Sequence, residues 1–88
     1  MKTMERILRL MAERKASDIY LSAHSPALIR INGNCVPINA QVLPTEAPLA
    51  LLAEVVPEHR IAELEGTGEL NMAIALEGAG NFRISAMR

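Results

Sequence analysis

The beginning of the chain repeats its apolar residues with the period of a helix. These residues follow the i, i+3, i+4, i+7 spacing of one helix face, and charged residues fill the positions between them. Thr3 is suited to cap this helix, because its hydroxyl can accept a hydrogen bond from a free backbone amide. We therefore predict an amphipathic helix that starts at Met4 and ends near Ala16. Its apolar face consists of Met4, Ile7, Leu8 and Met11.

After Asp18 the apolar residues recur at every second position, which is the pattern of half-buried strands. The predicted strands span residues 19–23, 27–32 and 34–38. Asn32 and Gly33 form the preferred two-residue hairpin loop, since both positions need a positive φ, so the second and third strands should be antiparallel. Pro37 has no amide hydrogen to donate, which predicts an edge position for the third strand.

The middle of the chain predicts two helices in succession. Thr45 is placed to cap the first helix, and Pro57 to occupy the first turn of the second. Gly66 and Gly68 follow the second helix and should end it. The predicted inward-facing residues are Leu49, Leu52, Ala53, Val56, Ile61 and Leu64.

Two alternating segments, Leu70–Leu76 and Phe82–Met87, predict a final hairpin with its turn at Glu77–Gly80. The element order is then α-β-β-β-α-α-β-β. Strands interrupted by one helical block predict an α+β fold, with an antiparallel or mixed sheet and helices packed on one face. Residues 1–88 form a single domain in this interpretation. Because Arg88 falls in or at the edge of a strand, we expect a fragment of a longer protein.

Composition limits the partners of such a domain. Half of the residues are apolar, yet the chain has one Tyr, one Phe and no Trp, so the core should be aliphatic. A formal net charge of −1 supplies no general attraction for nucleic acid or an anionic membrane. The longest apolar run, Pro48–Val56, contains Glu54 and falls far short of the roughly 20 residues of a membrane span. We expect a cytosolic chain that binds no nucleic acid and does not insert into a membrane.

Few residues of the chain suit catalysis or metal binding. His24, Cys35 and His59 are isolated from one another in sequence and lack the close spacing of zinc motifs. Cys35 lies among apolar residues of a predicted strand, which indicates an inert core position rather than a nucleophile. The chain has no GxxxxGK[ST] loop, so we predict no nucleotide hydrolysis by this chain alone.

Arg30 and Arg83 are the more informative candidates, because each projects from the polar face of a predicted strand. An arginine on a rigid strand is positioned to grip a carboxylate or phosphate with two parallel hydrogen bonds. The alternative is a solvated strand face, or a cross-strand ion pair with Glu69 or Glu77. The residue pattern leaves both interpretations open.

Three segments together resemble the N-terminal domain of the PilT and PilU family of type IV pilus retraction (twitching motility) ATPases, in the type II/IV secretion ATPase superfamily. They are KASDIYLSA (residues 15–23), IRING (29–33) and GNFRISAM (80–87), with Pro26 between the first two. They are similar to the family's ASD[LI]HLSAG, Pro, RV[DN]G and GRFRV[NS]AF patterns, and the match spans essentially the whole chain. The departures from these patterns are Tyr20 for His, His24 for Gly, Asn81 for Arg and Met87 for Phe.

The resemblance implies a PAS-like fold joined to a RecA-like motor domain that carries the Walker motifs. It also implies a homo-hexamer in which this domain packs against the motor domains of its own and a neighbouring subunit. ATP with Mg would then be the cofactor of the full-length protein, with none expected for the isolated domain. Arg83 matches the position from which the family lends an arginine to the ATP phosphates, and Arg30 and Arg88 are further candidates. The implied location is cytoplasmic, peripheral to the inner-membrane pilus machinery.

Two other functions remain open from the sequence. A PAS-like arrangement often encloses a small ligand, which would make the domain a sensor. The strand faces offer few polar groups to orient such a ligand, so a filled core is favoured. The other alternative is an interaction module that dimerises through an exposed strand edge.

Overall fold

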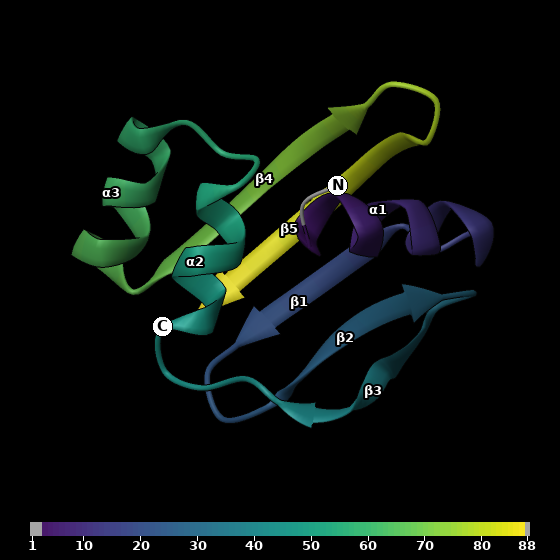
Figure 1. Cartoon of the computed structure of the whole chain (residues 1–88), viewed down its shortest axis with the longest axis horizontal. Coiled ribbons are helices and arrows are strands. Elements are labelled where there is room, and N and C mark those ends of the chain that lie inside the picture. Colours follow the sequence, from purple (N-terminus) through teal and green to yellow (C-terminus); the bar gives the residue numbers. More distant parts are fainter. Residues whose placement is uncertain (1–2, 88) are drawn as a thin grey trace.

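Five strands form one mixed sheet in the computed structural model, which describes residues 3–87 (Figure 1). The strand order is β3-β2-β1-β5-β4, in which β1 and β5 are parallel and every other neighbouring pair is antiparallel. The predicted α+β class and element order are confirmed. The elements are α1 (Thr3–Glu13), β1 (Asp18–Ser22), β2 (Pro26–Ile31), β3 (Asn34–Val42), α2 (Ala47–Ala53), α3 (Glu58–Thr67), β4 (Glu69–Leu76) and β5 (Gly80–Met87).

The two faces of the sheet differ because only one of them is covered by helices. In Figure 1, α1 and α2 lie in front of the sheet, and α3 lies beside β4. Beneath this layer, side chains from the central strands are completely buried against the apolar face of α1. Apart from Phe82, the buried cluster is aliphatic, as the composition predicts. Its fully buried members include Met4, Leu8, Met11, Ile19, Leu21, Ile29 and Ile84.

The hairpin between β2 and β3 confirms the Asn-Gly prediction. Asn32 and Gly33 have φ values of 51° and 81°, so both adopt the left-handed conformation that this turn requires. β3 lies at the edge of the sheet and includes Pro37, as predicted. The predicted end at residue 38 is wrong: β3 continues to Val42, and a register shift between Pro26 and Leu28 lets it follow β2 to the end.

The helix ends differ in detail from the sequence prediction. Thr45 does not cap α2; Glu46 occupies the N-cap and makes no side-chain cap hydrogen bond. Pro57 is not in the first turn of α3 but precedes it, with extended backbone. Gly68 ends α3 with a φ of 86°, whereas Gly66 lies inside the helix. The observed helix ends differ from the predicted ones by one or two positions, because several adjacent residues can serve as the end of a helix.

The N-terminus of α1 is held by a residue that is distant in sequence. Thr3, the predicted cap, already lies within the helix, and the backbone amide of Met4 donates to Glu54 Oε1 at 2.8 Å. Glu54 follows α2 directly, so this hydrogen bond joins the end of α2 to the start of α1. The carboxylate satisfies a free amide and also suits the positive end of the helix dipole.

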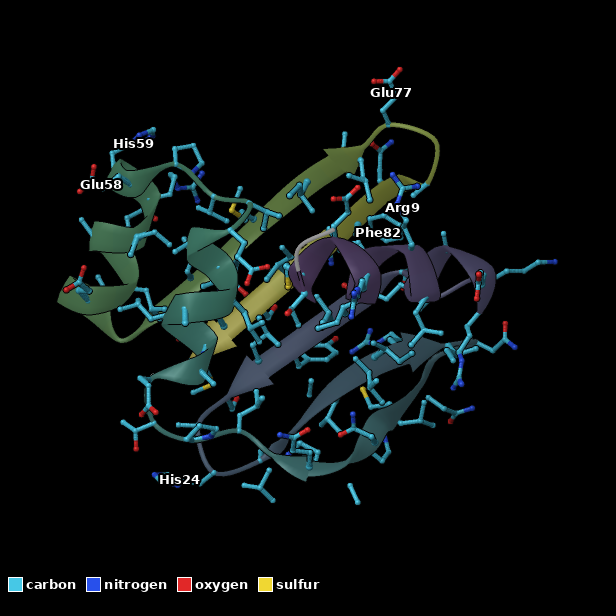
Figure 2. The ribbon with its side chains drawn as sticks, in the orientation of Figure 1. Arg9, His24, Glu58, His59, Glu77 and Phe82 are labelled. Atoms are coloured by element: carbon cyan, nitrogen blue, oxygen red, sulfur yellow. The ribbon has the colours of Figure 1, made fainter. Side chains whose placement is uncertain are left out.

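Glu54→Ala should therefore lower the free energy of unfolding by about 1 to 2 kcal/mol, because it leaves the partly buried Met4 amide without an acceptor. Glu54→Gln keeps an acceptor oxygen and should lose less. Urea unfolding followed by circular dichroism measures both. Glu77→Ala, in the exposed β4–β5 turn (Figure 2), is the control. Equal stability of Glu54→Ala and this control would show that the hydrogen bond contributes nothing.

Two glycines should respond oppositely to alanine. Gly33→Ala should cost about 1 kcal/mol, because its φ of 81° is strained for any residue with a Cβ even though the surrounding space is open. Gly66→Ala should add roughly 0.5 to 1 kcal/mol, because Gly66 is helical and nothing lies within 4 Å of the added Cβ. Thermal unfolding of both variants tests the pair, and a stabilising Gly33→Ala would contradict the assigned turn.

Candidate functional site

The uncovered face of the sheet brings both candidate arginines to one carboxylate. Asp18, at the start of β1, lies directly opposite Arg30 on β2 and directly opposite Arg83 on β5. Residues paired across adjacent strands point to the same face, so the three side chains form a row across the centre of the sheet. Helices cover the other face. The two arginines are therefore brought together on a surface that no described element covers.

Asp18 is the anchored member of this row. It is 8% exposed, and it is the one buried charged residue among residues 3–87. The hydroxyl of Ser17 donates to Asp18 Oδ2 at 2.5 Å, and Arg83 Nε lies 3.8 Å from Asp18 Oδ1. A buried carboxylate is costly unless positive charges and hydrogen bonds compensate it; here Arg83 on β5 supplies the charge and the preceding residue, Ser17, the hydrogen bond.

Arg83 lies at the β5 end of the row, and its side chain is accessible to a binding partner. Its side chain is 73% exposed, and its distance from Asp18 is longer than a direct hydrogen bond. Ser17, Asp18, Asn81 and Arg83 also line a shallow hollow beside the strands. Such a guanidinium can bind a phosphate or carboxylate at the rim of the hollow while the backbone of β5 stays in place.

Arg30 is held more fully by its neighbours. Its guanidinium carbon lies 5.5 Å from the centroid of the Tyr20 ring, within the range of a cation–π contact. The pKa of Arg30 is raised, first by a hydrogen bond to the Cys35 side chain, then by Tyr20, with a smaller contribution from Asp18. The contacts with Tyr20 and Cys35 turn Arg30 toward β1 and β3.

The positions of the arginines identify one cross-strand partner that the sequence did not suggest, while Arg83 remains largely exposed. The carboxylate against Arg83 is Asp18, so the ion pair with Glu69 or Glu77 is wrong for residues 3–87. The sequence interpretation missed Asp18, whose partners depend on which strands are neighbours. The signal available beforehand was its alternation with Tyr20 on the polar face of β1. Arg88, the third candidate, lies outside the described residues.

Cys35 is exposed, which corrects the prediction of an inert core position. The physical reason is its register: Cys35 lies opposite Arg30, on the face without helices, near the end of an edge strand. The apolar neighbours that suggested a core position alternate with it and point to the other face.

The described residues contain neither a metal-binding cluster nor a membrane-spanning helix. Within residues 3–87, no three His, Cys, Asp or Glu side chains come close enough together to hold a metal ion. His24 and His59 lie at opposite sides of the molecule (Figure 2). None of the helices α1 to α3 is long and apolar enough to cross a membrane.

An apolar groove lies between the helices and the β3 edge. It has a volume of about 370 Å³ and is open to solvent, and apolar side chains of α1, α2 and β3 dominate its lining. Asn39 and Gln41 supply side-chain amides at its wall. The groove lies beside the packed core and not inside it, because the central core residues have no exposed surface.

The two sheet edges are only partly available for pairing. β3 carries Pro37 and a register shift, both of which hinder the addition of another strand. On β4, Arg60 of α3 donates from Nη2 to the backbone oxygen of Asn71 at 3.4 Å, which occupies a carbonyl of that edge strand. Neither edge is a long, flat strand of free backbone groups.

Comparison with known proteins bears on what this face is for. The chain is 33% identical over 82 residues to the type IV pilus ATPase PilU of Pseudomonas aeruginosa PAO1, a match that covers 93% of the chain and 22% of PilU. It is 29% identical over 80 residues to the type IV pilus retraction ATPase PilT of the same strain, covering 91% of the chain and 23% of PilT. No family model matches the chain.

The fold agrees with these sequence matches. A crystal structure of the pilus retraction motor PilT with bound ADP superposes with a TM-score of 0.70 at 29% identity, covering 94% of the chain and 24% of that structure. The chain is related to the N-terminal domain of PilT and PilU. It spans between a fifth and a quarter of the length of these PilT and PilU relatives. The resemblance stated from the sequence motifs is thereby confirmed.

The exposed thiol of Cys35 generates a direct test of the register on this face. In the native chain, Ellman's reagent should titrate one thiol at a rate close to that of the urea-unfolded chain, since accessibility controls the reaction of an exposed cysteine. A thiol that reacts only after unfolding would show that β3 is shifted by one residue and that Cys35 faces the core.

Proposed function

We propose that the chain is the N-terminal accessory domain of a hexameric ATPase that powers type IV pilus retraction. In this proposal its uncovered sheet face packs on a neighbouring RecA-like motor domain and helps to close the ATP site. The relationship to PilU and PilT supports the retraction ATPase, and the row of Arg30, Asp18 and Arg83 supports the role at the nucleotide. ATP, with Mg, would be bound mainly by the motor domain.

The exposed guanidinium of Arg83 is the single observation that carries the role at the nucleotide. A chain with a net charge of −1 has no general attraction for a polyphosphate, so binding must come from a local group. Arg83 is 73% exposed beside a hollow, on a strand in the interior of the sheet. A rigidly placed arginine can stabilise phosphate charge at no cost in reorganisation when the site closes.

The other residues of the site fit a polyphosphate in different degrees. Asn81 lines the same hollow, and its side-chain amide can donate one hydrogen bond where the family pattern often has an arginine. Arg30 is two strands from Arg83, roughly 10 Å away at the backbone. Arg30 is therefore the better candidate for a contact to the neighbouring protein, and Arg83 for the phosphates. A contact from Arg88 stays a prediction from the family pattern.

The proposed setting follows from the same relationship. The domain would belong to a homo-hexamer on the cytoplasmic side of the inner membrane and act with the basal machinery of the pilus. A sheet face without helices is a suitable surface for a neighbouring domain, because half-buried Tyr20 and Leu28 and exposed Met87 remain available for packing there. Such contacts would complete the burial that the helices provide on the other face.

A small-ligand sensor is the second candidate, and the groove of about 370 Å³ is the observation that favours it. This volume lies near the lower limit for ligand sites, and the groove is open along one side. The packed core leaves no enclosed cavity among its central residues. The interaction module that pairs through a strand edge is disfavoured by Pro37 and by the Arg60 hydrogen bond on β4.

Arg83→Ala in the full-length protein should lower ATP turnover at saturating ATP by about tenfold to a hundredfold, as expected when a charged group stops stabilising phosphate charge. ATP hydrolysis is measured in the assembled protein as a function of ATP concentration. Because Arg83 is largely exposed, the variant should keep the fold, which circular dichroism of the 88-residue chain verifies.

Arg6→Ala is the matched control, since Arg6 is an exposed arginine on α1, away from the uncovered sheet face. It should hydrolyse ATP like the unaltered protein. Unchanged turnover in Arg83→Ala would remove Arg83 from the nucleotide site and with it the main support for the proposed role. An equal loss in both variants would point to hexamer assembly instead.

A further inference from the structure

We infer that Asp18 is the positioning residue of the arginine row: it holds Arg83 by its Nε side and leaves the outer guanidinium nitrogens free for an anion. The inference deepens the proposed function and rests on it for the identity of the anion, a nucleotide phosphate. Asp18 itself does not contact that phosphate. Its effect is exerted through Arg83, whose direction it sets.

The first support is the register of three adjacent strands. Asp18 is paired with Arg30 across β1 and β2 and with Arg83 across β1 and β5. Two guanidinium groups on the same face would repel each other and turn outward independently. One carboxylate between them reduces that repulsion, and Arg83 is the arginine that approaches it.

The second support is that the carboxylate is itself held by a hydrogen bond and by burial. Asp18 is 8% exposed, and the Ser17 hydroxyl donates to Oδ2 at 2.5 Å, which leaves Oδ1 directed at Arg83. The backbone is fixed as well, because the amide of Arg83 donates to the backbone oxygen of Ser17 at 3.0 Å. Ser17 and Asp18 thus hold both the main chain and the side chain of Arg83.

The third support is the length of the ion pair and the guanidinium nitrogen that makes it. Nε of Arg83 approaches Asp18 at 3.8 Å, while the side chain remains 73% exposed. An arginine that uses its Nε edge for a protein carboxylate still offers its two terminal nitrogens to a second anion. The long distance makes the pair weak, so Arg83 is oriented by Asp18 and not withheld from the anion.

A merely structural Asp18 and a competing Asp18 make different predictions. If Asp18 only stabilises the sheet, its loss lowers stability and leaves the motion of Arg83 and the apparent affinity for ATP unchanged. If Asp18 competes with the phosphate for Arg83, its loss tightens ATP binding. If Asp18 positions Arg83, its loss makes Arg83 more mobile and weakens ATP binding.

The test on the chain itself compares Asp18→Asn with the unaltered sequence by nuclear magnetic resonance. Heteronuclear relaxation of the arginine Nε–H groups should show Arg83 more ordered than exposed Arg6 in the unaltered chain and as mobile as Arg6 in Asp18→Asn. Backbone amide signals of the core report whether the variant is folded. Ser17→Ala, which keeps the charge and removes the hydroxyl, should give an intermediate mobility. Glu77→Gln removes one exposed carboxylate elsewhere and should change nothing.

The test in the full-length protein separates KM from kcat. Asp18→Asn should raise the KM for ATP about twofold to fivefold, the range expected for one exposed ion pair, and should lower kcat in the same direction as Arg83→Ala but by less. Glu77→Gln should keep the original KM. A lower KM in Asp18→Asn would show competition and overturn the inference. Equal Arg83 mobility in Asp18→Asn and the unaltered chain would overturn it independently of any activity.

Failure of the inference and failure of the proposed function give different results. If Arg83→Ala leaves ATP turnover unchanged, Arg83 does not act at the nucleotide, whatever its mobility. If Arg83→Ala is impaired while Asp18→Asn matches Glu77→Gln in KM, the proposed function stands and the positioning role of Asp18 fails.

Discussion

The parallel pairing of β1 with β5 is the constraint on which the rest of this structure depends. Each hairpin alone buries little, and their union along β1 and β5 creates the sheet over which α1 and α2 pack. The same pairing sets both faces at once. It places Ile19 against Ile84 beneath the helices and Asp18 against Arg83 on the uncovered side. Core and candidate site are therefore two consequences of one register, and a slip of one residue would exchange them.

The arginine row shows how a nearly neutral domain can carry a strong local charge. A single carboxylate lies between two guanidinium groups on neighbouring strands, so the central row has an excess of one positive charge on a face that no helix shields. Confining positive charge in this way favours a partner that presents a phosphate or carboxylate at one position. It offers little to a long polyanion, whose binding depends on many distributed contacts. Selectivity here rests on placement more than on total charge.

Much of the fold could be predicted from the sequence because its signals are local. The heptad-like spacing around Leu8 and the Asn32-Gly33 turn each depend on residues a few positions apart, and both were confirmed. The features that were missed depend on distant contacts. The Glu54 carboxylate at the start of α1 and the position of Asp18 between two strands follow from tertiary packing alone. Both arginines were identified from strand alternation, whereas the residue that organises them required knowledge of the neighbouring strands.

The central position of β5 also has a consequence for the order in which the chain can fold during synthesis. β1 emerges early, yet its parallel partner is the last strand of the described residues, so the middle of the sheet stays open until β5 has been made. Closing contacts between such distant segments is slow, because the entropy of the intervening loop must be lost first. Until then Ile19 and Leu21, which are completely buried in the finished fold, lack their cover from β5. The strand that closes the sheet is thus the strand that carries Arg83, so the row with Asp18 and Arg30 forms only when the sheet closes.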